Sequence, residues 1–183
     1  MNFISYVFLN WRMIYSLITN DFKKQFLGSY LGVAWAFIQP LMMVLVLWAV
    51  FEFGFRSSSR ESDAPFYIWL IAGMFPWFFF SSGMSSGYQA ITSNAFLLKK
   101  ISFNPEVLPF VKIVSALIIH FFLIILLMFL LVLEGYTPNI YWLQAPFYMG
   151  VLCLLLLGLT WLTSGIYVFV KDINSIVGII LQV

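Results

Sequence analysis

The sequence predicts an all-α integral membrane protein with an interfacial N-terminal helix, four complete membrane spans and the start of a fifth. Two observations lead to this fold class. Of the 183 residues, 63% are hydrophobic and only 9% are charged, whereas a soluble domain carries roughly 25% charged residues. The charged residues are also clustered, and the uncharged runs between them can cross a bilayer, for which about 20 residues suffice. We therefore expect residues 1–183 to form a single transmembrane domain.

Residues 1–24 combine apolar and polar positions in a helical rhythm. Trp11, Ile14 and Ile18 recur at near-helical spacing, while Arg12 and Asp21 interrupt the apolar run. This pattern is typical of an amphipathic helix that lies in the membrane interface and does not cross the bilayer. Packing of this helix on the rest of the protein is a compatible alternative.

Apolar runs with at most one charged residue define the expected spans. We predict spans at residues 25–55, 66–92, 109–133 and 141–170. The last apolar run, residues 173–183, is too short to cross a bilayer. We therefore expect it to be the start of a truncated fifth span, and the sequence to be a piece of a longer protein.

Small residues and prolines predict where the spans pack and bend. Two Gly-x-x-x-Gly pairs favour close helix packing, because small residues let two backbones approach. Two prolines inside the spans predict kinks, because proline interrupts the helical hydrogen-bond ladder. The positions are Gly28 with Gly32, Gly83 with Gly87, Pro40 and Pro76.

The basic residues predict the orientation of the chain. Only Arg56 and Arg60 fall on the side opposite the N-terminus. Lys and Arg accumulate in cytoplasmic loops, so the N-terminus is expected to be cytoplasmic. The basic residues on the N-terminal side are Arg12, Lys23, Lys24, Lys99, Lys100, Lys112 and Lys171.

Residues 93–108 are the expected cytoplasmic connection between spans two and three. Ser93 or Asn94 can cap a short helix, and Asn104-Pro105-Glu106 is typical of the start of the next helix. Such a segment is suited to docking on a soluble partner, or it is a capped loop on the lipid headgroups. Composition alone favours the loop. The apolar side of the short helix would contain Phe96, Leu97 and Ile101.

Several kinds of chemistry are not expected from this sequence. It contains no Gly-x-x-x-x-Gly-Lys-Ser/Thr stretch to hold ATP phosphates, so we expect no cofactor in this chain. The spans carry no Asp, Glu, Lys or Arg near their middle, where ion-coupled transporters usually place such groups. His120 is the one ionisable residue there; it either relays protons or hydrogen-bonds a neighbouring helix, and we favour the second. No catalytic arrangement or metal-ligand cluster is evident, so we expect neither enzymatic activity nor a metal site.

Aromatic residues are abundant in the first two spans. Their rings can stack on sugar rings and so provide a path for a polymer. The alternative is lipid contact and interfacial anchoring, to which we assign most of them. The residues considered include Trp35 and Trp48 in span one and Trp77 in span two.

Three stretches of the sequence resemble one known family, the membrane subunits of ABC transporters that export O-antigen, capsule or teichoic-acid polysaccharides. DFKKQFLGSYLGVAWAFIQPL resembles the family's basic entry and first span, and WFFFSSGMSSGYQAITSNAFLLKKISFNPEVLP resembles its second-span end and cytoplasmic segment. KDIN resembles its motif after the fourth span, although Lys171 replaces the usual arginine and lacks the bidentate fork. The matching positions are Leu31, Gly32, Trp35, Pro40, Leu41, Phe80, Ser81, Asn94, Leu97, Lys100, Phe103, Pro109 and Asp172, with Lys171 as the departure.

The resemblance implies a permease subunit in a homodimeric channel of six-span subunits, which moves a lipid-linked polysaccharide across the bacterial inner membrane. It implies that separate ATPase subunits bind ATP and magnesium, that membrane lipids surround the channel and that no nucleic acid is involved. A drug or small-molecule exporter of the same ABC class is the alternative, and an ion-coupled transporter is a less favoured one. The implied ATPase-coupling residues are Asn94, Phe96, Leu97, Leu98, Lys99 and Lys100. The channel candidates are Tyr30, Trp35, Trp48 and Trp77, with Tyr30 and Trp35 expected near the cytoplasmic mouth.

Overall fold

The computed structural model describes residues 3–25, 28, 30–54, 65–98 and 103–182. All regular secondary structure in these residues is helical, which confirms the predicted all-α fold class. Helical segments long and apolar enough to span a membrane cover Gly32–Ala49, Phe66–Gly87, Val107–Leu133 and Ile140–Phe169. The chain is therefore a multi-pass membrane protein.

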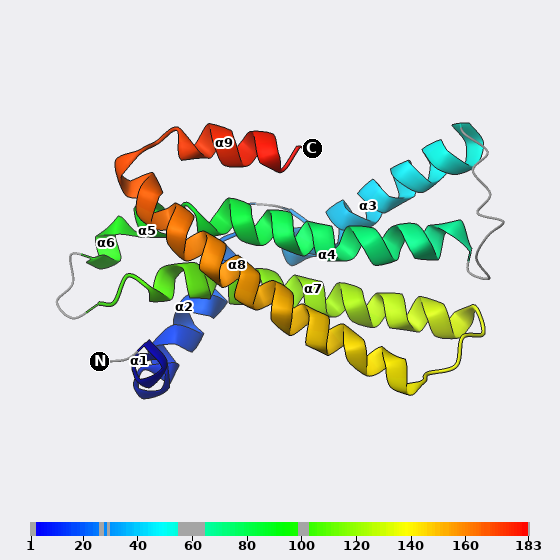
Figure 1. The fold of residues 1–183 in the computed structure, drawn as a ribbon, viewed down its shortest axis with the longest axis horizontal. Coiled ribbons are helices and arrows are strands. Elements are labelled where there is room, and N and C mark those ends of the chain that lie inside the picture. Colours follow the sequence, from blue (N-terminus) through cyan, green and yellow to red (C-terminus); the bar gives the residue numbers. More distant parts are fainter. Residues whose placement is uncertain (1–2, 26–27, 29, 55–64, 99–102, 183) are drawn as a thin grey trace.

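Helices α4 (Phe66–Gly87) and α7 (Val107–Leu133) form the centre of the bundle and run side by side along their length (Figure 1). Their contact is the most extensive of any helix pair in the described residues. The side chains of Phe75 from α4 and Leu123 from α7 are almost entirely buried in it. At one end, the Tyr67 hydroxyl donates a hydrogen bond to Glu134. At the other end, α5 (Ala90–Ser93) and α6 (Ala95–Leu98) lead from α4 toward α7.

Helix α8 (Gln144–Phe169) follows a short 3₁₀ turn at Ile140–Leu143 and crosses the central pair diagonally (Figure 1). It approaches α4 most closely at Gly83 and Gly87, one of the two glycine pairs for which we expected close packing. A Cβ atom on Gly83 would lie 3.0 Å from Leu156, and one on Gly87 would lie 2.3 Å from Thr160. Helix α9 (Ile173–Ile180) then folds back beside α4 and α8.

The N-terminal segment forms two helices, α1 (Phe3–Leu9) and α2 (Trp11–Lys24), where the sequence predicted one helix over residues 1–24. The break lies at Asn10, whose side-chain amide donates to the Tyr6 carbonyl at 3.0 Å and ends the first helix. Helix α2 buries Ile14 and Ile18 against the first turns of α7. A salt bridge between Asp21 and Lys112 joins the same two helices.

Helix α3 (Trp35–Ala49) starts later than the expected span of residues 25–55. It is preceded by a 3₁₀ turn at Gly32–Ala34 and followed by a π-helical turn at Val50–Gly54. Gly28 and Gly32 adopt φ values of +87° and +53°, a backbone region that favours glycine. A Cβ atom on either would meet nothing within 4 Å, so the expected close packing at these two glycines is absent within the described chain.

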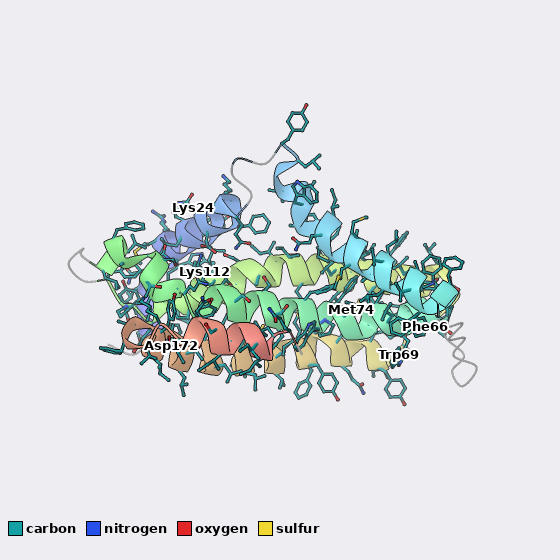
Figure 2. All side chains as sticks on the ribbon, turned by 90° about the horizontal axis from the view of Figure 1, so that it is seen from above. Lys24, Phe66, Trp69, Met74, Lys112 and Asp172 are labelled. Carbon is teal, nitrogen blue, oxygen red and sulfur yellow. The ribbon has the colours of Figure 1, made fainter. Side chains whose placement is uncertain are left out.

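The two prolines expected to bend the spans lie inside α3 (Pro40) and α4 (Pro76). Helix α3 runs obliquely to the central pair and is not parallel to it (Figures 1 and 2).

Candidate functional site

One end of the bundle gathers the segments that the sequence marked as cytoplasmic. The N-terminus, α6 and the turn between α8 and α9 all lie at this end (Figure 1). Lys112 and Asp172 lie toward the same end, whereas Phe66 and Trp69 lie at the opposite one (Figure 2). The fold thus brings the predicted coupling segment, the N-terminal helices and the KDIN stretch to one end of the molecule.

The predicted coupling segment begins at the last residue of the very short helix α5 and contains the very short helix α6, and its first polar residues close α5. The Asn94 amide donates to the Ala90 carbonyl at 3.0 Å, and the Ser93 hydroxyl donates to the Gln89 carbonyl at 2.8 Å. We expected Ser93 or Asn94 to cap the start of a helix with its side chain. Both side chains instead bond back to α5, because the carbonyls at its end need donors. Only the Asn94 carbonyl serves α6, accepting from the Leu97 amide at 2.9 Å.

Helix α6 presents apolar side chains at the molecular surface. Phe96 is 54% exposed and Leu98 is 38% exposed, while Leu97 is half-buried. The Lys24 ammonium lies 5.8 Å from the centre of the Phe96 ring, within the range of a cation–π contact. The end of α2 therefore reaches α6. Lys99 and Lys100, also predicted to couple to the ATPase, lie outside the described residues.

The return from this segment into α7 is fixed by neighbouring helices. The Asn104 side chain accepts a hydrogen bond from the Glu106 amide at 3.0 Å and so forms the turn before α7. The backbone N–H of Asn104 donates to the Tyr6 hydroxyl at 3.4 Å, and the Trp161 indole N–H donates to the backbone carbonyl of Glu106 at 3.0 Å. Contacts from α1 and α8 thus hold the start of α7, and α6 sits between two anchored helix ends.

The KDIN stretch lies where α8 turns into α9. The Lys171 ammonium lies 4.4 Å from the centre of the Tyr167 ring, and Asp172 immediately precedes α9. The Tyr88 hydroxyl donates to the Asn174 side chain and accepts from the Gln89 amide. This link between the end of α4 and the start of α9 was not expected from the sequence, because it joins residues 86 positions apart.

A cavity of about 770 Å³ lies between α3, α4 and α7. Of the four channel candidates, Trp35 lines it and the other three do not. Tyr30 is fully exposed before α3, Trp48 packs edge-on to Phe53, and Trp77 stacks with Phe80. The sequence did not identify the polar part of the lining, which includes Gln39, Ser82 and Ser85. Gln39 lies on α3 and the two serines lie on α4. The helical register of these residues is the only sequence signal that could have placed them at a common cavity.

His120 is a buried residue in the wall of this cavity. Its ring stacks on Phe79, with ring centres 4.7 Å apart, and it hydrogen-bonds the backbone carbonyl of Phe75. This matches the favoured interpretation that His120 binds a neighbouring helix. The second ring nitrogen, Nδ1, has no hydrogen-bond partner among the described residues.

Comparisons with known proteins agree with the resemblance found in the sequence. An O-antigen export system permease protein, RfbA, of Myxococcus xanthus is 28% identical over 165 residues, which cover 90% of this chain and 62% of that protein. Two RfbA permeases of Klebsiella pneumoniae are each 25% identical over 165 residues, which cover 89% of this chain and 62% of each relative. The chain is similar to O-antigen export permeases.

The relatives confirm the resemblance to the membrane subunits of polysaccharide-exporting transporters, and they support a transport subunit. No protein-family model matches the chain. The chain spans about 62% of the length of these curated relatives.

Proposed function

We propose that this chain is a permease subunit of an ATP-driven exporter that carries a lipid-linked polysaccharide across the bacterial inner membrane. The observation that carries the proposal is the similarity to O-antigen export permeases over 165 residues. The cargo is a polymer of O-antigen, capsule or teichoic-acid type. Two copies of the permease form the channel within the membrane lipids.

ATP hydrolysis belongs to a partner in this proposal. The chain has no phosphate-binding loop, so ATP and magnesium are bound by separate ATPase subunits. The docking surface is the coupling segment around α6. Its support is the exposed Phe96 on a short helix between two anchored helix ends, an arrangement that transmits movement of a partner to α4 and α7.

Deletion of the gene in its own host tests the proposed function. We expect polymer to accumulate inside the cell and to disappear from the surface, with export restored by the full-length gene. Export should persist when the proton gradient is collapsed while ATP remains, since no carboxylate or basic residue lies near the middle of the spans. Normal surface polymer in the deletion strain would refute the proposal, and increased drug sensitivity instead would favour the small-molecule exporter.

The N-terminal segment is proposed to stay on the cytoplasmic side. Arg12 interrupts its apolar residues, and burying an arginine at mid-bilayer costs at least about 2.5 kcal/mol. Cysteine at the exposed position Ser5 (S5C), in a Cys153→Ser background, should react with membrane-impermeant maleimide only in inside-out vesicles. Labelling of the S5C variant in intact spheroplasts would show that the N-terminal segment lies on the opposite side of the membrane.

A further inference from the structure

The cavity between α3, α4 and α7 is walled by one face of each helix. Trp35 and Gln39 lie one turn apart on α3, and Ser82 and Ser85 lie three residues apart on α4. His120 comes from α7. The volume of the cavity, about 770 Å³, is within the usual range of small-molecule sites, about 300–1,000 Å³.

The serines on α4 divide into two groups. Ser81 and Ser86 use their hydroxyls within the helix, donating to the carbonyls of Phe78 at 3.3 Å and Ser82 at 2.8 Å. Among the described residues, the hydroxyls of Ser82 and Ser85 and the amide of Gln39 have no hydrogen-bond partner and border the cavity. Nδ1 of His120, buried in the same wall, is a further acceptor without a partner in that part of the chain. The cavity thus offers several unused hydrogen-bonding groups.

The charge of the lining restricts what these groups would bind. Among the described residues that line the cavity there is no Asp, Glu, Lys or Arg, so an ionic ligand would find no counter-charge there. An acyl chain would leave the polar groups buried without partners, which is unfavourable. Hydroxyls and an amide both donate and accept, which suits the hydroxyl groups of a neutral sugar, and the Trp35 indole provides a flat apolar surface for the sugar ring.

We infer that this cavity is a subsite for a neutral sugar residue of the exported polymer, with Gln39, Ser82 and Ser85 as hydrogen-bonding residues and Trp35 as the stacking surface. The inference rests on the proposed function, because the polymer supplies the sugar. It places polymer contact at a polar face of α4 that is separate from the glycine face packed on α8.

Cysteine protection in cells tests this assignment. Ser85→Cys and the matched control Ser86→Cys are introduced singly into the full-length permease carrying Cys153→Ser, in the presence of its partner. Labelling by N-ethylmaleimide is compared in cells that make the polymer and in cells whose polymer synthesis is blocked. We expect polymer to slow labelling of Ser85→Cys about tenfold, a change that corresponds to a binding free energy of about 1.4 kcal/mol. Labelling of Ser86→Cys should stay unchanged.

Each other outcome overturns the subsite. Equal labelling of Ser85→Cys with and without polymer means that no polymer occupies the cavity. Protection that persists without polymer means that lipid or another protein segment fills it, and no labelling in either strain means that the cavity is closed. If Ser85→Cys does not reach the membrane, Ser82→Cys replaces it. Polymer export in the deletion strain is measured alongside, so a failed proposed function is distinguished from a failed subsite.

Discussion

Replacing Phe96 and Leu97 together with alanine is expected to abolish polymer export and to loosen co-purification of the ATPase. Phe96 is more than half exposed on α6, and a helix of four residues has little stability of its own. Burying a Phe or Leu side chain contributes roughly 1.5–3 kcal/mol, so truncating two at an interface centre is enough to separate two proteins. Surface polymer and ATPase retained on the affinity-tagged permease are the two measurements.

The matched control is Phe129→Ala with Leu133→Ala on α7, away from the coupling end; Phe129 is as exposed as Phe96, and Leu133 is more exposed than Leu97. This control should insert, export polymer and retain the ATPase. Replacing Lys99 and Lys100 should have a smaller effect, since charges at an interface rim contribute less than its apolar centre. An apolar double variant that exports polymer and keeps its ATPase contradicts the coupling assignment and returns the segment to a headgroup-bound loop.

Gly87→Ala is expected to destabilise the bundle by about 1–3 kcal/mol, the usual cost of overpacking a close contact. The added Cβ would lie 2.3 Å from Cγ2 and 2.9 Å from Cβ of Thr160, which is completely buried on α8. Thermal unfolding of the detergent-solubilised protein should shift to lower temperature by several degrees.

Gly73→Ala, on the same helix, is the control, because its Cβ would meet nothing within 4 Å. Combining Gly87→Ala with Thr160→Ser should recover part of the lost stability. Serine removes the nearest methyl group and keeps the hydroxyl that donates to the Leu156 carbonyl at 2.7 Å. Equal unfolding temperatures for the Gly87 and Gly73 variants would show that the contact between α4 and α8 is loose.

The glycine pairs show how far the sequence predicts this fold. Gly28/Gly32 and Gly83/Gly87 have the same spacing, yet in the part of the chain that the structure describes only the second pair meets another helix. Spacing indicates which residues share a helix face. Gly28 and Gly32, however, lie before α3 begins, and both have a positive φ. Backbone conformation of this kind is set by where a helix starts, which the uncharged run of span one did not reveal.

Apolar helices of spanning length were predictable, because bilayer thickness and the exclusion of charge determine the length and composition of such a helix. Expected spans three and four, at 109–133 and 141–170, correspond to helical segments that begin and end within a few residues of these bounds. The contacts that organise the candidate site were not predictable. Tyr6 with Asn104 and Trp161 with Glu106 join distant segments, and tertiary packing alone brings these groups together.

The placement of the serines beside Gly83 and Gly87 was only partly predictable from the sequence. The sequence marked this stretch as a close-packing face, whereas the structure separates it into two. Gly83 and Gly87 face α8, and Ser82 and Ser85 face the cavity beside α3. Helical periodicity predicts this separation, but the identity of the element on each side comes only from the fold.

The salt bridge between Asp21 and Lys112 imposes an order on biosynthesis. The two residues are 91 positions apart, so α2 has no docking site on α7 until the ribosome has completed two intervening hydrophobic segments. At about 5–20 residues per second, this delay is roughly 5–18 s. During that time Ile14 and Ile18 need another apolar environment, and the amphipathic pattern of α2 lets the membrane surface hold the nascent N-terminus until α7 arrives.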